Sequence, residues 1–384
     1  MGGWAACPAG GTPRFGPRHV VGGGAFRPGL GIGWGVRPGL RCRLGARLHG
    51  REEARAGRGR WGRGRGRRGA GRAAAGRGRD VAEGDGGRKV VVVGVPMDLG
   101  ADRRGVDMGP SAIRYAGLYA ELERAGRVVE DRGNLAVPIP ESRPRPTEHL
   151  KYVEEIAAAC RELAQVVAGA RAEGAFPLVL GGDHSIAIGT IAGASAGGPG
   201  VGVIWVDAHG DFNTADTSPS GNIHGMPFAV SCGIGDPRLL AARIGAPAVD
   251  PRRAVLVGAR TLDPGEKALL REAGVTVLTM TEIDKYGMRE VMERALEVAG
   301  GGGARVHISF DLDAIDPTWA PGVGTPYPGG ITYREAHLAM EMAWESGLVD
   351  SAEFVEVNPI LDRENRTAAM AVGLIGSLLG RRIL

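Results

Sequence analysis

The stretch VGVIWVDAHGDF, residues 201–212, joins a strand to a cluster of chemically reactive side chains. Its first six residues are an almost continuous apolar run, as expected of a strand that helices cover on both faces. Asp207, His209 and Asp211 follow at alternate positions, so they share one face if the chain stays extended. An apolar strand with such an end predicts a parallel α/β sheet with a polar site at its edge.

The chain downstream of Arg88 repeats this strand pattern. Six further Val-rich apolar runs predict strands at residues 89–96, 177–184, 254–260, 275–280, 305–313 and 352–359. Helical patterns lie between them, and three pairs have capping-box spacing: Asp263 with Glu266, Thr281 with Asp284, and Thr332 with Glu335. We therefore predict a single α/β domain over residues 88–384, with three α/β/α layers and a mostly parallel sheet.

Acids and imidazoles follow four of the predicted strands. These residues are His184, Asp207, His209, Asp211, Asp311, Asp313 and Glu356. A single His or Asp-x-Asp pair is more often a cap or a satisfied polar group than a metal ligand. In open α/β folds, however, the carboxyl ends of the strands meet at the ligand site, and four aspartates gathered there would repel one another without cations. The set therefore predicts a metal site.

The chemistry of these ligands indicates which metal and which reaction to expect. Carboxylates with imidazole and no thiolate favour Mn²⁺, while Fe, Co and Zn stay open. Two divalent cations that share carboxylates generate hydroxide near neutral pH and stabilise the charge of a transition state. The residues alone therefore predict a hydrolase with two metal ions.

Residues 1–87 have a different composition from the rest of the chain. They hold 18 Arg, no Lys, no Ser and five acids, which gives them a formal charge of +13, whereas the whole chain carries +4. We predict that this Gly/Arg-rich extension is disordered, because it has too little apolar surface to form a core. A secretory signal is excluded by the lack of a long apolar core, and an organellar transit peptide is disfavoured by the lack of Ser.

Two interpretations of this extension stay open. Our preferred hypothesis is a mis-called start, in which the Gly/Arg-rich extension is not part of the native protein. The alternative is an arm that binds RNA through charge and stacking. The remainder of the chain is acidic, so we expect no nucleic-acid partner outside this extension.

Cysteine usage and hydropathy bear on the cellular compartment. Cys7, Cys42, Cys160 and Cys232 are widely spaced and form no CxxC motif, so we expect reduced thiols in the cytoplasm. No apolar run reaches the length of a membrane span, and we expect no membrane partner.

Six motifs, in order along the chain, resemble those of the ureohydrolases. They are GGDHS (181–185), DAHGDFNT (207–214), SGNIHGMP (220–227), SFDLDAIDP (309–317), PGVGTPYPGG (321–330) and EFVEVNP (353–359). Their spacing is similar to that of bacterial-type arginases, and the resemblance covers residues 88–384. It implies the arginase/deacetylase-like fold, two Mn²⁺ ions per subunit and a homo-oligomer, either a trimer or a hexamer.

The resemblance also implies the metal ligands and the reaction. One Mn²⁺ would be bound by His184, Asp207, Asp211 and Asp311, and the other by His209, Asp207, Asp311 and Asp313. A hydroxide that bridges the metals would attack the guanidinium carbon of L-arginine, giving L-ornithine and urea. In this scheme Asp211 passes a proton to the leaving amine, His224 is the proton shuttle, and Glu356 pairs with the guanidinium.

The substrate contacts implied by the family fall on a second set of residues. Asn213, Ser220 and Asn222 match contacts to the α-carboxylate, Asp263 matches a contact to the α-ammonium, and Thr325 lies in an element near the substrate. Glu266 matches a position near the amino group, although its capping-box spacing explains it equally well. Thr261 departs from the pattern, because some arginases carry an aspartate there that faces the amino group.

Two alternative functions stay open. The first is an agmatinase or another guanidino hydrolase that uses the same metals. The second, more distant, is an RNA-associated protein that acts through the Gly/Arg-rich extension.

Overall fold

The computed structural model describes residues 87–382, apart from residues 145, 147, 244 and 247. The predicted disorder of residues 1–87 concerns a segment that, except for Gly87, lies outside the described residues. The same holds for Cys7 and Cys42. Within the described part of the chain, no helix is both long enough and apolar enough to cross a membrane.

An eight-stranded sheet runs through the centre of the described residues. Its strands are β1 (Val90–Val95), β2 (Val129–Asn134), β3 (Phe176–Gly181), β4 (Val201–Val206), β5 (Ala254–Val257), β6 (Thr276–Leu278), β7 (Arg305–Asp311) and β8 (Val349–Val355). They lie in the order β2-β1-β3-β8-β7-β4-β5-β6, and all neighbours are parallel. All seven predicted strands are confirmed.

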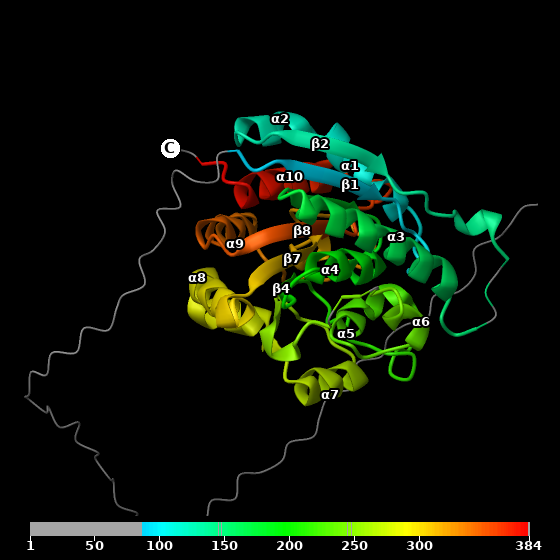
Figure 1. Ribbon diagram of the computed structural model, residues 1–384. Coiled ribbons are helices and arrows are strands. Elements are labelled where there is room, and N and C mark those ends of the chain that lie inside the picture. Colours follow the sequence, from blue (N-terminus) through cyan, green and yellow to red (C-terminus); the bar gives the residue numbers. More distant parts are fainter. Residues whose placement is uncertain (1–86, 145, 147, 244, 247, 383–384) are drawn as a thin grey trace, which may run out of the picture. The chain divides into compact units, whose positions relative to one another are not determined.

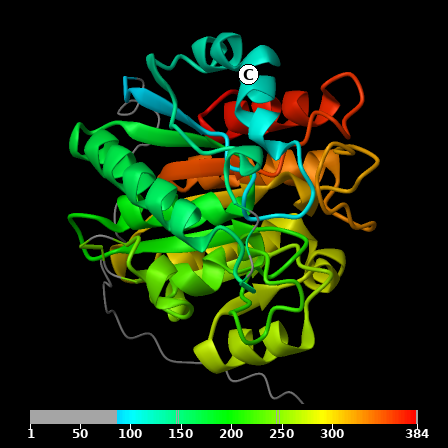
Figure 2. The same ribbon diagram turned by 90° about the vertical axis from the view of Figure 1, so that its right-hand side faces the viewer.

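Helices cover both faces of this sheet. They are α1 (Gly109–Tyr115), α2 (Leu118–Arg124), α3 (Val153–Ala172), α4 (Ala187–Ser195), α5 (Pro227–Ser231), α6 (Pro237–Leu240), α7 (Pro264–Ala273), α8 (Met280–Ala299), α9 (Tyr333–Glu345) and α10 (Arg366–Leu378). Figure 1 shows β4, β7 and β8 side by side, and Figure 2 shows helices on both sides of the strands.

The core is divided into two apolar clusters by the sheet. One cluster packs α8, α9 and α10 against the sheet, and the other packs α3, α4 and α5 against it. Val90 and Val92 belong to the first cluster, whereas Val91 and Val93 belong to the second. Because side chains alternate along a strand, a continuous run of valines fills both interfaces. The predicted three-layer α/β/α architecture is confirmed.

Two local features differ from the sequence prediction. Strand β2 was not predicted, because its sequence VEDRGN is polar and its last three residues are exposed at the sheet edge. The capping box predicted at Thr281 and Asp284 is wrong: α8 begins two residues earlier, with Thr279 as its N-cap and Glu282 as the reciprocal partner. The capping boxes that begin at Asp263 and at Thr332 are confirmed.

The strand order places the reactive side chains together. β3 and β4 follow one another in the chain but are separated in the sheet by β8 and β7. The strand order therefore changes direction at the centre, which is where ligands bind in open α/β sheets. The carboxyl ends of these four central strands lead to His184, Glu356, Asp311 and Asp207.

Candidate active site

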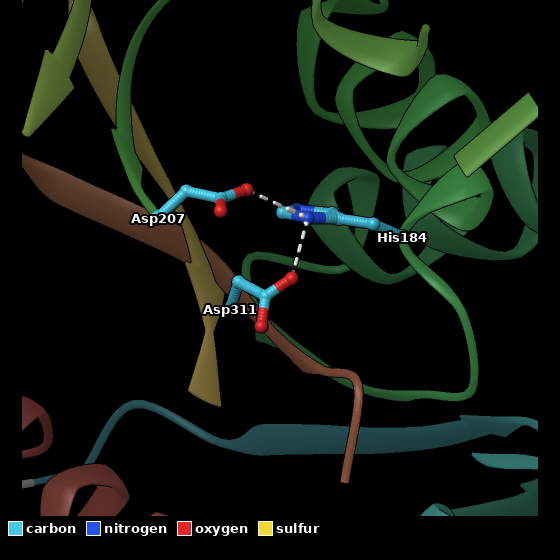
Figure 3. A group of neighbouring side chains, drawn as sticks. All are labelled: His184, Asp207 and Asp311. Carbon is cyan, nitrogen blue, oxygen red and sulfur yellow. Dashed lines mark ion pairs between the residues drawn. The ribbon is translucent and has the colours of Figure 1, made fainter. Parts of the chain in front are cut away.

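The first group of candidate metal ligands surrounds the His184 imidazole. Its Nδ1 lies 3.3 Å from Asp207 Oδ2, 3.0 Å from Asp211 Oδ2 and 3.2 Å from Asp311 Oδ2. Figure 3 shows His184 approaching from one side while Asp207 and Asp311 approach from the ends of their strands. All four side chains are buried. Three carboxylates thus converge on one nitrogen.

A second group adjoins the first through Asp207. His209 Nδ1 lies 3.5 Å from Asp207 Oδ1 and 3.0 Å from Asp313 Oδ2. Asp207 therefore offers one carboxylate oxygen to each group, and both groups have ligand atoms close enough to hold an ion. The structure brings all six predicted metal ligands into this double cluster.

The hydrogen bonds around His184 indicate how its ring is protonated. Ser309 Oγ lies 2.7 Å from His184 Nε2 and donates its proton to Glu353 Oε1 at 2.8 Å. Since a hydroxyl has a single proton, Ser309 accepts from Nε2–H, which leaves Nδ1 as the ring nitrogen that faces the carboxylates and could ligate a metal. That Nδ1 is buried and has no hydrogen-bond partner among the described residues.

The charge of the cluster also fits bound cations. Burial and the neighbouring Asp207 charge raise the pKa of Asp211 to about 7. Burial, Asp313 and Asp207 raise the pKa of Asp311 well above its usual range. Buried carboxylates at this spacing need positive charge to stay ionised together at neutral pH. The buried Nδ1 of His184, without a hydrogen-bond partner among the described residues, and the crowded carboxylates therefore fit a pair of divalent metal ions.

Sequence reasoning missed the residues that orient these ligands. Trp205 Nε1 donates to Asp207 Oδ2 at 2.9 Å, and the Trp205 ring stacks on His184 with 4.1 Å between ring centroids. Ser309 and Glu353 complete the support. Ser309 alternates with Asp311 and Asp313, so its place on the same face of β7 was a usable signal.

The backbone is strained at two of the predicted catalytic residues. Asp211 has φ of +48° and Glu356 has φ of +64°, both in the left-handed region that non-glycine residues seldom adopt. The Asp211 carbonyl accepts the backbone N–H of Phe228 at the start of α5, which helps to hold that conformation. Such strain is common where the surrounding structure fixes reacting groups.

His224, which is partly exposed, and the buried Glu356 form a pair beside the proposed metal ligands. His224 Nδ1 lies 3.0 Å from Glu356 Oε1, and the backbone N–H of His184 donates to the same oxygen at 3.0 Å. Burial lowers the pKa of His224, but the Glu356 hydrogen bond and charge outweigh it and raise the value to about 9. This contact therefore favours the protonated form of His224, which can donate a proton.

A cavity lies against the double cluster. Its wall contains ten of the residues that the sequence analysis assigned to the site: His209, Asp211, Asn213, Ser220, Asn222, His224, Asp263, Glu266, Asp311 and Thr325. Ser218, Pro219, Gly225 and Thr261 also line it, although none of them was predicted to contact substrate. Glu356 lies behind this wall, 1% exposed.

Several residues predicted to contact the substrate form hydrogen bonds with each other or with the proposed metal ligands. Asn213 Nδ2 donates to Asp263 Oδ2 at 3.1 Å, and Thr325 Oγ1 donates to Asp313 Oδ2 at 2.9 Å. Glu266 accepts from the backbone N–H groups of Phe212 at 2.9 Å and Asp263 at 3.1 Å. Glu266 thus caps α7 and ties it to the loop that carries Asp211, and its place in the cavity wall is compatible with both interpretations of this residue.

Comparisons with known proteins agree with this geometry. The Arginase family matches residues 88–380 of the chain. Arginases of Brevibacillus brevis and Bacillus subtilis (strain 168) are each 54% identical over 297 residues, which cover 77% of this chain and 99% of each relative. The native structure of arginase from Bacillus caldovelox has a TM-score of 0.75 and 52% identity, covering 77% of this chain and 100% of that one. The chain belongs to the arginase family.

Proposed function

We propose that this chain hydrolyses L-arginine to L-ornithine and urea with two Mn²⁺ ions bound per subunit. The observation that carries the proposal is the double imidazole–carboxylate cluster, shared through Asp207, at the wall of a polar cavity. Relatives named arginase, more than half identical over the whole domain, support the same activity.

The proposed metal ligands are those of the two groups. His184, Asp207, Asp211 and Asp311 would hold one ion, and His209, Asp207, Asp311 and Asp313 the other. The oxygen-rich ligand set, with imidazole and without thiolate, supports Mn²⁺. When bound, the ions would supply a water molecule of lowered pKa and positive charge for the transition state. Metal analysis of the reconstituted protein tests both the identity and the count.

The cavity residues would then move the protons of the reaction. Water adds to the guanidinium carbon, and the bond from that carbon to arginine Nε breaks. Asp211, next to both the ligands and the cavity, would accept a proton from the water and pass it to Nε, which becomes the side-chain amine of ornithine. The remaining fragment becomes urea when it loses the second proton of the water, which leaves the product amine to take up one proton in turn.

His224 and Glu356 would serve this step from the other side. His224 lines the cavity and, with its raised pKa, is poised to exchange protons with the product amine. The two hydrogen bonds of the Glu356 side chain described above both use Oε1, and Oε2 faces Gly324, where a Cβ would lie 3.4 Å away. We assign Oε2 to pair with the guanidinium as a charge-assisted contact.

The outer cavity would recognise the amino-acid end of the substrate. Hydroxyl and amide groups of Asn213, Ser220 and Asn222 suit the α-carboxylate, and Asp263 suits the α-ammonium, with Glu266 and Thr325 beside them. Agmatine has the same guanidinium and chain but no carboxylate, so it would leave these donors unpaired.

Urea release from L-arginine and agmatine, measured side by side, is the decisive experiment. We expect kcat/KM for L-arginine to exceed that for agmatine by at least about 100-fold, because a site built for a polar group rejects an analogue that lacks it. Equal rates, or a preference for agmatine, would assign the chain to another guanidino hydrolase with the same metal site.

Assembly and compartment are proposed on narrower grounds. We propose a trimer or hexamer from the resemblance to the family, and light scattering that shows a monomer would contradict it. Cys160 and Cys232 are free and buried, which supports the proposed cytoplasmic location of the enzyme.

A further inference from the structure

A short segment ahead of α3 lies directly on the loop that carries Ser220 and Asn222. Gly221, between these two residues, has φ of +69°, and a Cβ built there would lie 2.1 Å from the backbone oxygen of His149. Only glycine allows this approach. The segment 148–152 is therefore a packed neighbour of the proposed carboxylate pocket.

Lys151 extends from this segment to the pocket itself. Its Nζ donates to Asn222 Oδ1 at 3.0 Å and to Asp102 Oδ1 at 2.5 Å, joining segments that follow β1, precede α3 and follow β4. About a third of the Lys151 side chain is exposed, compared with about two thirds of that of Asp102. Lys151 thus lies between the solvent and the wall of the cavity.

The contact with Lys151 decides which end of the Asn222 amide is free. An ammonium group can only donate, so the amide oxygen must face it and the amide nitrogen must point elsewhere. Asp102 stays ionised, because the hydrogen bond from Lys151, with a smaller contribution from the Asn222 amide, lowers its pKa. The Asn222 amide nitrogen carries two hydrogens, so it can donate one to Asp102 and the other into the cavity that Asn222 lines.

We infer that Lys151 is a positioning residue for substrate specificity, which holds the Asn222 amide with its nitrogen toward the α-carboxylate of L-arginine. The inference rests on the proposed function. With Lys151 removed, the amide is free to turn its oxygen toward the carboxylate, which repels it. Agmatine has no carboxylate, so the orientation of Asn222 is immaterial to its binding.

The test compares the full-length Mn²⁺-loaded protein with Lys151→Met, Lys151→Gln and Lys151→Arg. Lys285→Met, an exposed lysine on α8 far along the chain from the pocket, is the matched control. Urea release gives kcat and KM for L-arginine and for agmatine, and the unfolding temperature reports on folding. We expect Lys151→Met and Lys151→Gln to lower kcat/KM for L-arginine about tenfold, mainly through KM, as for the loss of a charge-assisted hydrogen bond.

The same two variants should change kcat/KM for agmatine less than about twofold. Lys151→Arg, which keeps a charged donor, should retain most of the wild-type kcat/KM for L-arginine. Lys285→Met should behave as the wild type with both substrates. An equal fall with both substrates would show that Lys151 only supports the fold, and unchanged kinetics would show that it does nothing; either result overturns the inference. If the wild-type protein itself does not prefer L-arginine, the proposed function fails first, and the inference falls with it.

Discussion

The hydroxyl of Ser309 offers a sharp test of how the metal site is held. It links His184 Nε2 at 2.7 Å to Glu353 Oε1 at 2.8 Å, and all three side chains are almost completely buried. The Ser309→Ala change removes the acceptor for the Nε2–H and the donor to the carboxylate. Glu353 Oε1 keeps its contact with His307 Nε2 at 3.5 Å, so the Nε2–H of His184 is the group left without a partner. A buried polar group in that position costs about 1–3 kcal/mol, so the free energy of unfolding of the metal-free protein should fall by about that amount.

The effect on the metal should be distinct from the effect on stability. Without Ser309, the His184 ring loses the contact that selects its tautomer and aims Nδ1 at the carboxylates. Loss of such an outer contact typically weakens metal binding by about 10- to 100-fold. Dialysis against buffers of fixed free Mn²⁺, followed by metal analysis, measures this change, and urea denaturation measures the stability.

Ser351→Ala is the matched control. Ser351 Oγ lies 3.0 Å from His307 Nδ1 in the same buried network, and neither residue touches a proposed metal ligand directly. This variant should lose a similar amount of stability while retaining the metal much better. If Ser309→Ala holds both ions as tightly as Ser351→Ala, the role assigned to the Ser309 hydroxyl is wrong.

Three further predictions follow from the site and the fold. Asp313→Ala should retain roughly one Mn²⁺ per subunit instead of two and lose most of its turnover, since the second ion would keep only His209, Asp207 and Asp311 as ligands; two tightly held ions with normal activity would refute the ligand assignment. His224→Ala should lower kcat by about 10²- to 10⁴-fold, as for the loss of a proton donor, with unchanged metal content; loss of metal would make His224 a ligand instead. Burial chiefly lowers the pKa of His337 in the folded protein, so its contribution to stability is complete above the unfolded value of about 6.5 and is lost as the pH falls below it. The drop in the free energy of unfolding from pH 7 to pH 5 should therefore be smaller in His337→Gln, and an equal drop would contradict this.

The sequence by itself determined seven of the eight strands, the layers and which acids and imidazoles gather at the carboxyl edge of the sheet. Continuous valine runs can only be buried on both faces, and that requirement selects a parallel sheet between two helical layers. Alternate spacing in Asp207-x-His209-x-Asp211 and Asp311-x-Asp313 is a local property. The rule that ligands bind at the carboxyl ends of parallel strands then predicts that these groups meet.

Features that depend on contacts between distant segments were decided by the tertiary structure alone. Strand β2 has no apolar pattern, because at the sheet edge it pairs only with β1. Ser309 and Glu353 are 44 residues apart, and Lys151 and Asn222 are 71 apart, so nothing in their local sequence indicates that they meet. Periodicity and capping depend on interactions between residues that are close in the sequence. The partner that orients a histidine or an amide depends instead on how distant strands and loops pack, and these meet only when the chain folds.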